Sequence, residues 1–275
     1  MDKINIRKVF KEKNPKVAKM LPGFMYRYIE RIVHQKEIND ALFSFKDKMG
    51  LDFINAVIEY FNIHIHIKGE ENIPKDGRYI FSANHPLGGL DGIVFAHVVG
   101  QIYPNIQFLV NDLLMNLENF ESIFIPVNKH GRQSMEYVRK IEKTYQSDSQ
   151  MLNFPAGLCS RKVNGEIIDL EWKKSFITKA VQHKRDIVPV HIDGRNSNFF
   201  YNLSNIRIKL GVKANIEMLY LSNEMFKQRN MDITLSFGKP IPYATFDKSL
   251  KAKDWAKKVK DHIYQIAKDS SKEFK

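Results

Sequence analysis

The sequence predicts an α/β fold, in which a central sheet of mostly parallel to mixed strands lies between flanking helices. Three observations predict it. Short apolar runs alternate with helical runs from residue 63 onward, several apolar runs end in a turn, and 275 residues suffice for one large domain with helical additions. We therefore expect a buried sheet whose active groups gather at strand ends.

Residues 1–62 are predicted to be a helical region that associates with a membrane. Its opening is basic and amphipathic, because lysines and arginines interleave with Ile6, Val9 and Phe10 until Pro22 interrupts the pattern. Two later runs keep the three-to-four spacing of one apolar helical face, which also suits packing on the rest of the protein. They are Met25, Tyr28, Ile29, Ile32 and Val33, and Phe53, Ile54, Val57, Ile58 and Phe61.

Residues 63–242 are predicted to form the α/β domain, and residues 243–275 a closing basic helix. The expected strands are residues 63–68, 79–83, 106–110, 123–127, 151–154, 187–192 and 233–237. The expected helices lie near residues 91–100, 132–146 and 172–183, and residues 198–230 are again helical.

The stretch from Phe81 to Gly92 carries the strongest chemical signal. It places His85 and Asp91 on either side of a glycine-rich bend, directly after an apolar strand. An imidazole, whose ordinary pKa is about 6.5, takes a proton from a hydroxyl while a nearby carboxylate holds its tautomer. The same residues also suit a plain tight turn in which Asp91 caps a helix.

Three further blocks follow in order, each where an apolar strand meets a turn. They are Phe124-Ile125-Pro126, Phe154-Pro155-Ala156-Gly157 and Val188-Pro189-Val190. With the His-to-Asp block, this series resembles the glycerophosphate and lysophospholipid acyltransferases, the PlsC-like family, over about residues 67–242. The resemblance implies that His85 is the catalytic base, that Asp91 is its partner, and that residues 63–242 are the catalytic domain.

The sequence departs from the family pattern in ways that bear on the acceptor. Five residues separate His85 from Asp91, where the commonest pattern has four, and a hemolysin-like, amino-lipid branch of the family shares the longer spacing. Val127 stands where the second block usually ends in an acceptor-binding arginine. Ala156 and Cys159 stand where the third block has Glu and Arg. Neither valine nor cysteine replaces the bidentate fork with which arginine holds a phosphate.

We therefore expect an acceptor with an amino-acid carboxylate, such as a monoacylated glycine or ornithine lipid. Lys129, Arg161 and Lys162 offer the positive charge. The expected reaction moves a fatty acyl group from acyl carrier protein or acyl-CoA to the free hydroxyl of that lipid. Backbone amides of Gly157, or of the Gly88-Gly89 bend, are expected to stabilise the oxyanion. The alternatives are a lysophosphatidate acyltransferase and a non-catalytic lipid-binding membrane protein.

The net charge of +12 predicts an acidic partner: nucleic acid, anionic lipid or acidic carrier protein. Nucleic acid is disfavoured, because the sequence has no zinc-finger spacing, RNA-binding aromatic signature or helix-turn-helix pattern. An anionic membrane surface and an acidic carrier protein remain as expected partners. With no long apolar run and no signal-peptide pattern, the expected location is cytoplasmic, peripheral on the inner face of the cell membrane.

The remaining reactive residues add no further chemistry to the prediction. Cys159 is the single cysteine, which fits a reducing compartment, and a structural role is favoured over an acyl-thioester nucleophile. His64 and His66 lack a third ligand, so no metal is predicted. No phosphate loop or dinucleotide fingerprint predicts a cofactor, and no Gly-x-Ser-x-Gly elbow predicts a serine hydrolase.

Overall fold

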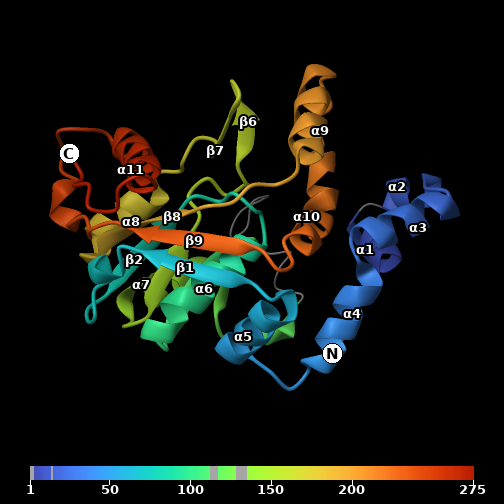
Figure 1. Cartoon of the computed structure of the whole chain (residues 1–275), viewed down its shortest axis with the longest axis horizontal. Helices are drawn as coiled ribbons and strands as arrows, with labels where there is room; N and C mark the ends of the chain where they lie inside the picture. The colour runs from blue at the N-terminus through green and yellow to red at the C-terminus, as the bar shows by residue number, and fades with distance from the viewer. Residues whose placement is uncertain (1–2, 14, 112–116, 128–134) are drawn as a thin grey trace.

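The computed structural model describes residues 3–13, 15–111, 117–127 and 135–275 (Figure 1). Seven strands form one sheet in the order β1-β9-β8-β2-β5-β3-β4. Their bounds are β1 His64–Lys68, β2 Tyr79–Ala83, β3 Ile106–Asn111, β4 Phe124–Val127, β5 Gln150–Asn153, β8 Asp186–Ile192 and β9 Asp232–Phe237. All neighbours are parallel except β8 and β9. The predicted α/β fold with a mostly parallel sheet is confirmed.

Helices cover both faces of the sheet, because its strands carry apolar side chains on both sides. In β2, Ile80 and Phe81 are both fully buried and point into different clusters, as the two-residue period of a strand requires. On the Phe81 face lie α5 (Gly50–Phe61) and α6 (Leu90–Ile102). On the other face lie α7 (Met135–Gln146), α8 (Ser175–His183) and α11 (Ala252–Ile266).

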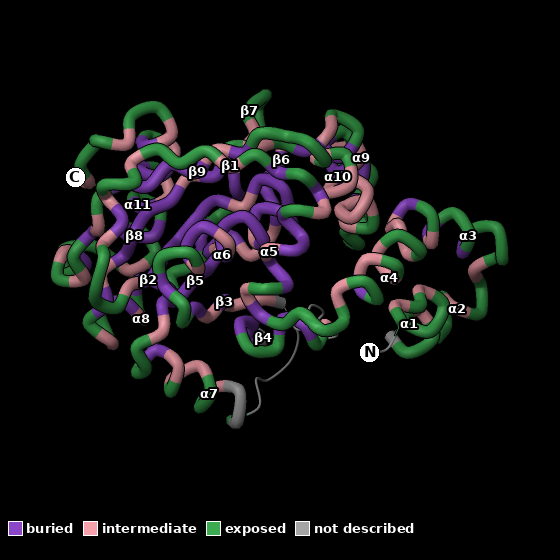
Figure 2. The backbone as a smooth tube through the Cα atoms, turned by 60° about the horizontal axis from the view of Figure 1, so that its bottom comes forward, coloured by how far each residue is buried: buried purple, intermediate pink, exposed green. Residues whose placement is uncertain are grey.

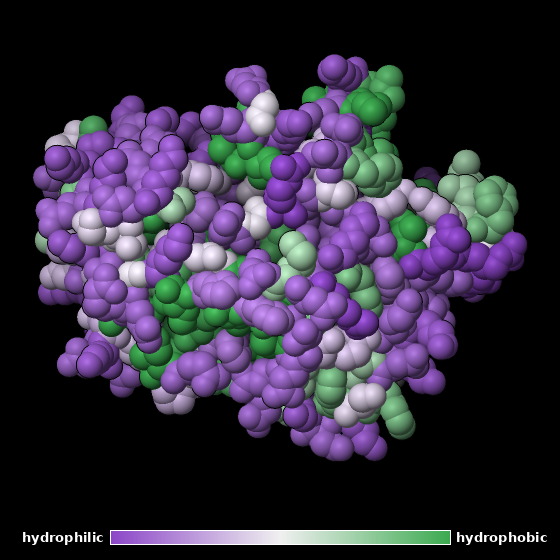
Figure 3. Space-filling model, viewed as in Figure 1, coloured by the Kyte–Doolittle hydropathy of each residue, from purple (hydrophilic) through white to green (hydrophobic). Residues whose placement is uncertain are grey.

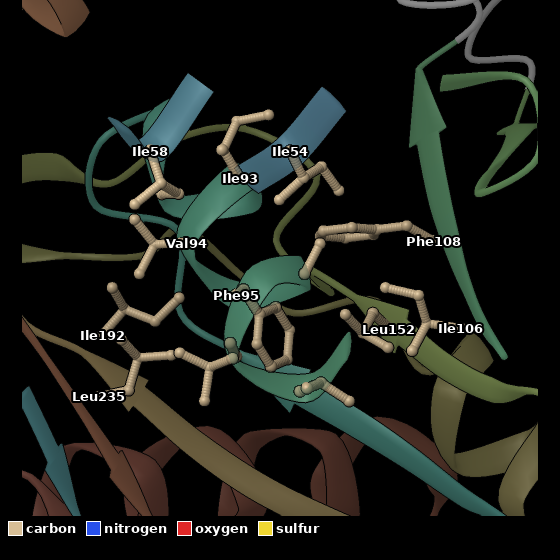
Figure 4. Close-up of a cluster of buried hydrophobic side chains, with 14 of the residues drawn as sticks. Ile54, Ile58, Ile93, Val94, Phe95, Ile106, Phe108, Leu152, Ile192 and Leu235 are labelled. Atoms are coloured by element: carbon tan, nitrogen blue, oxygen red, sulfur yellow. The ribbon is translucent and has the colours of Figure 1, made fainter. Parts of the chain in front are cut away.

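The larger core lies between the sheet and the helices α5 and α6. Figure 4 shows Ile54 and Ile58 of α5 above Val94 and Phe95 of α6, with Leu152 of β5 beside Phe95. Figure 2 shows the buried backbone concentrated in the sheet and these helices. Because α5 packs in this core, residues 50–61 belong to the body of the protein, although they fall within the predicted N-terminal region.

The first four helices extend from this body at one end of the molecule (Figure 1). They are α1 Ile6–Lys13, α2 Pro15–Met20, α3 Gly23–Ile32 and α4 Gln35–Ser44. Their contacts with the body include two between aromatic side chains. The hydroxyls of Tyr28 and Tyr220 lie 2.7 Å apart, and the ring of His34 stacks on Phe226 with centroids 4.0 Å apart.

A second projection follows β8, and it is made by α9 (Asn198–Lys209), the 3-10 turn η4 (Ile216–Tyr220) and α10 (Leu221–Lys227). Ser197 caps α9 by accepting the Phe200 N–H at 3.3 Å. The short hairpin β6 (Arg161–Val163) and β7 (Glu166–Ile168) lies against α9. Among the described residues, no helix has the length and apolar composition needed to cross a bilayer.

Candidate active site

The chain leaves β2 through residues 84–89 and enters α6, and this bend forms the candidate site. Asn84 fixes its start, since its side chain donates to the Ile192 carbonyl at 2.9 Å and accepts the Ile192 N–H at 2.7 Å. Gly88 has φ +83°, and a Cβ there would lie 2.7 Å from Leu221 Cδ2. Only glycine fits this conformation and this close approach, so the bend requires it.

His85 and Asp91 meet across this bend, with Nδ1 of His85 2.9 Å from Oδ2 of Asp91. The carboxylate is fully buried in the first turn of α6, while His85 keeps part of its surface exposed. Backbone N–H groups of Leu87 and Gly88 donate to the same oxygen at 2.8 and 3.1 Å, and the Gly92 N–H donates to Oδ1 at 2.9 Å. Every contact of Asp91 is thus a donor, as an ionised carboxylate requires.

The pKa of Asp91 follows from this shell of donors. Burial alone raises the pKa of a carboxyl, but the facing His85 and the amides of Leu87 and Gly88 outweigh burial and hold the pKa of Asp91 below its usual range. Asp91 therefore stays ionised at neutral pH. The bond to Nδ1 directs the second ring nitrogen of His85, Nε2, away from the carboxylate and leaves it to act as a base.

Phe154 supports the imidazole from one side. Its ring stacks on His85 with centroids 4.0 Å apart and planes inclined by 15°. Phe154 follows β5, which pairs with β2 so that Asn153 lies beside Ser82. The first and third sequence blocks therefore converge because neighbouring parallel strands end at the same edge of the sheet.

A second buried carboxylate, Asp169, holds the backbone of His85. Its Oδ1 accepts the His85 N–H at 3.1 Å and the Ser160 hydroxyl at 2.6 Å, and its Oδ2 accepts the Trp172 indole N–H at 2.8 Å. Ser160 closes the loop by donating its own N–H to the His85 carbonyl at 2.7 Å. Both backbone groups of His85 are thus fixed by this pair of residues.

Sequence reasoning missed Asp169, and one physical signal points to it in the structure. Its side chain is buried, and burial raises the pKa of its carboxyl although Ser160, the His85 amide and Trp172 oppose the shift. The backbone around it is also held, since the Asp169 N–H donates to the Tyr264 hydroxyl at 2.8 Å. A desolvated carboxylate beside the candidate base marks a residue under functional constraint.

The three glycines predicted to stabilise an oxyanion differ in what their N–H groups do. The Gly88 N–H donates to Asp91, and the Gly157 N–H donates to the Phe154 carbonyl at 2.9 Å. The Gly89 N–H has no acceptor among the described residues, and Gly89 directly precedes α6. Gly89 is therefore the glycine of the three whose N–H remains available to a ligand.

Arg161 has a different role from the predicted acceptor contact. It is buried, and its guanidinium donates to the Cys159 carbonyl at 2.7 Å and to Glu217 Oε1 at 3.0 Å. A guanidinium held inside the protein in this way is not displayed to a substrate. Lys162 lies next to it on β6 and is partly exposed, and Lys129 lies outside the described residues.

Cys159 is buried beneath Arg161, whose Nη1 lies 3.0 Å from its sulfur. Burial raises the pKa of the Cys159 thiol to about 11, although Arg161 opposes the shift. A thiol with this pKa is protonated at neutral pH and is a poor nucleophile. The structural role favoured from the sequence therefore agrees with the geometry.

The molecule also has a surface hollow of about 420 Å³ between α8 and α11, lined in part by Val181 and Trp255. None of the predicted site residues lines it. Its position on the helices of one sheet face separates it from the bend after β2, so we give it no part in the chemistry of His85.

The chain is similar to several known acyltransferases. A lyso-glycine lipid O-acyltransferase of Bacteroides thetaiotaomicron is 51% identical over 96% of this chain and 97% of its own length. One of Phocaeicola vulgatus is 48% identical, over 96% and 95%. The solved 1-acyl-sn-glycerophosphate acyltransferase PlsC of Thermotoga maritima aligns with a TM-score of 0.46 at 18% identity, over 90% of this chain and 95% of its own. The family model described as acyltransferase matches residues 8–271, so the chain belongs to the acyltransferase family.

Proposed function

We propose that this acyltransferase moves a fatty acyl group from a thioester to the free hydroxyl of a lyso-glycine lipid. The observation that carries the chemistry is the 2.9 Å contact of His85 with a buried, ionised Asp91. The acceptor is supported by the two relatives named lyso-glycine lipid O-acyltransferase, which are about half identical to this chain over nearly its whole length. An amino-acid headgroup also agrees with the absence of phosphate-binding arginines at Val127 and Cys159.

The proposed reaction begins when Nε2 of His85 takes the proton of the acceptor hydroxyl. The oxygen attacks the thioester carbonyl, the tetrahedral intermediate collapses, and the carbon–sulfur bond breaks. The imidazolium returns its proton to the departing thiolate, so that an ester and a free thiol are the products. Asp91 stays ionised throughout, fixes the tautomer of His85 and stabilises the imidazolium.

The oxyanion of that intermediate needs donors that are not already engaged. The Gly89 N–H meets this requirement and lies next to the start of α6, where the helix dipole adds partial positive charge. Gly88 instead serves by holding Asp91, and Gly157 by closing the turn after Phe154. We therefore assign oxyanion stabilisation to Gly89 and positioning to the other two glycines.

The acceptor headgroup is proposed to meet its positive charge at Lys162 and Lys129. Lys162 lies on β6 with its side chain partly exposed, and Lys129 follows β4 in the sequence. Arg161 acts only indirectly, since its guanidinium is used inside the protein. A lysine point charge suits one carboxylate better than it replaces the arginine fork of a phosphate site.

The donor is proposed to be acyl carrier protein or acyl-CoA, and the enzyme is proposed to act on the inner face of the cell membrane. The first helices support attachment there. Met20 at the end of α2 is 81% exposed, Phe24 follows it at 63%, and exposed Lys16 and Lys19 adjoin them. An apolar group surrounded by lysines suits the interface of an anionic bilayer.

The proposal is tested with purified protein by following acyl transfer to lyso-glycine lipid and to lysophosphatidate, each with carrier-bound and CoA-bound donor. We expect diacylated glycine lipid as the preferred product. A clear preference for lysophosphatidate contradicts the acceptor, and no thioester consumption with either acceptor favours a non-catalytic lipid-binding protein. His85→Ala should lower kcat by about 10²–10⁴-fold.

His66→Ala is the matched control for the His85 variant. His66 also faces an aspartate, Asp232, at 2.7 Å, but this pair is exposed on the edge strand β1 and its neighbour β9. Its removal should leave the rate unchanged. Equal losses from both substitutions would contradict the assignment of the base.

A further inference from the structure

The second projection of the molecule ends in an exposed aliphatic surface, which we call the α9 tip, residues 206–216. Ile206, Ile208 and Leu210 are 54%, 59% and 73% exposed, and Val212 and Ile216 are exposed as well. Gly211, at φ +69°, lets the chain turn back toward η4. Figure 3, in the view of Figure 1, shows hydrophobic residues at the outer end of α9. Five exposed aliphatic side chains within eleven residues form a patch rather than scattered contacts.

The charges on the α9 tip are all positive. Lys209 and Lys213 are exposed within the patch, and residues 198–216 contain no aspartate or glutamate. The first acid after the tip is Glu217, which is fully buried between Arg207 and Arg161. An aliphatic patch with lysines and no exposed carboxylate is complementary to an anionic lipid surface.

Polar contacts connect the α9 tip to the body. Glu217 Oε2 lies 2.8 Å from Arg207 Nε, and the Arg207 guanidinium also donates to the Val212 carbonyl at 2.9 Å, which ties both sides of the turn. Glu217 Oε1 lies 3.0 Å from Arg161, which donates to the Ser160 carbonyl at 3.3 Å. Ser160 in turn donates to His85. A continuous chain of polar contacts therefore joins the tip to the candidate base.

We propose that the α9 tip inserts into the anionic bilayer and, with the first helices, seats the site on the membrane. The inference rests on the proposed function only in that the acceptor is a membrane lipid. The Tyr28–Tyr220 contact joins α3 to the base of this projection, so both apolar elements belong to one connected framework. Figure 3 shows a second hydrophobic group at the outer end of α2 and α3.

The first test places an environment-sensitive fluorophore at Leu210→Cys. Cys159 is fully buried, so the introduced thiol is labelled selectively in the folded protein. On vesicles of phosphatidylcholine with phosphatidylglycerol, we expect a blue shift and quenching by brominated lipid. Val181→Cys on α8, also an exposed aliphatic position, is the control and should show neither. A label at residue 210 that stays in water while the protein sediments with vesicles overturns the proposal.

The second test measures vesicle affinity directly. Ile208→Asn combined with Leu210→Asn should weaken binding at least about 30-fold, because insertion of each aliphatic side chain contributes more than about 1 kcal/mol. Lys209→Gln with Lys213→Gln should weaken binding by up to about 30-fold on anionic vesicles, at about 1 kcal/mol for each lysine, and should have little effect on phosphatidylcholine alone. Lys248→Gln with Lys251→Gln, exposed lysines before α11, is the matched control.

Failure of this inference is distinct from failure of the proposed function. The tip variants should retain the wild-type turnover of a short-chain, water-soluble lyso-glycine lipid, because the tip does not touch His85. Unchanged vesicle affinity in both tip variants overturns the inference and assigns attachment to the first helices. If the wild-type protein does not turn over the water-soluble lyso-glycine lipid, the proposed acceptor is contradicted, and the vesicle measurements still test the α9 tip.

Discussion

Asp169→Asn is expected to lower the catalytic rate by more than its loss of fold stability explains, because Asp169 positions His85. The carboxylate accepts the His85 N–H at 3.1 Å, the Ser160 hydroxyl at 2.6 Å and the Trp172 indole at 2.8 Å. An asparagine keeps one oxygen for His85 and Ser160, but it turns an NH2 group toward the indole N–H. One hydrogen bond to a charged group is lost, and two donors are forced together.

The loss of this bond sets the size of the stability effect. A hydrogen bond to a charged group is worth about 1.5–3 kcal/mol, and the neutral amide recovers part of this because it avoids the desolvation that raises the pKa of Asp169. We expect a net destabilisation of about 1–3 kcal/mol. At about 2–4 °C for each kcal/mol in a chain of this size, Tm should fall by about 2–12 °C.

The catalytic effect should exceed what this stability loss explains. Ser160 and Asp169 hold both backbone groups of His85, and a displacement of the base by about 1 Å costs about 10²-fold in rate. We expect kcat to fall by about 10–10²-fold, with KM for the acceptor changed by less than about twofold. Rates are measured per folded molecule, well below the Tm of the variant.

Asp186→Ala is the control, since it also removes one hydrogen bond to a carboxylate but at a distance from the site. Asp186, the first residue of β8, accepts the Tyr243 N–H at 2.9 Å. The candidate site lies at the other end of β8, where Asn196, a few residues after the strand, donates to the Pro86 carbonyl. Its substitution should lower Tm without lowering kcat. If Asp169→Asn keeps the kcat of the Asp186 variant, the positioning role is refuted and Asp169 is structural only.

Two further predictions follow from burial and backbone geometry. Burial lowers the pKa of His191 to about 4, although Asp193 opposes the shift. The stability that the neutral imidazole contributes is therefore fully present above its ordinary pKa of about 6.5, and it is lost as the pH falls toward 4. By pH ~5 the free energy of unfolding should have fallen by about 2 kcal/mol. In denaturant unfolding measured across this pH range, His191→Gln should make the free energy of unfolding less dependent on pH; an unchanged dependence would contradict the role of His191. Gly88→Ala should abolish most turnover and lower Tm more than Gly165→Ala does, because both glycines have left-handed φ but only residue 88 has a neighbour, Leu221, within 2.7 Å. Equal effects of the two substitutions would show that backbone strain alone causes the loss and that the close approach to Leu221 does not contribute.

The elements that carried strong local signals were predictable from the sequence. Six of the seven strands of the main sheet contain β-branched or aromatic residues, and only β5, Gln150–Asn153, lacks them. The closing helix shows its buried face at Trp255, Val259, Ile263 and Ile266. The contact of His85 with Asp91 was predictable because a tight bend places a residue in the first turn of a helix close to the residue before the bend. These features depend on neighbours in sequence.

The features that were missed depend on partners far away in sequence. Asp169 is 84 residues from His85, and nothing in its local sequence marks it as buried. Arg161 was expected to offer positive charge to the acceptor. Charged residues are seldom buried unless paired, and the partner that allows its burial, Glu217, is 56 residues away. The β6–β7 hairpin did carry a signal, since Asn164-Gly165 with φ values of +51° and +89° is a typical two-residue hairpin turn.

The buried Arg161–Glu217–Arg207 cluster is better explained by geometry than by stability. An apolar set of similar volume often stabilises a core as well as a buried ion pair does, whereas guanidinium groups fix direction through several donors. Here one guanidinium fixes the carbonyls of the loop that holds His85, and the other fixes the turn of the α9 tip. If the tip inserts as proposed, its depth sets the height of the base above the bilayer. That height would then determine which hydroxyl of a membrane-embedded acceptor meets Nε2 of His85.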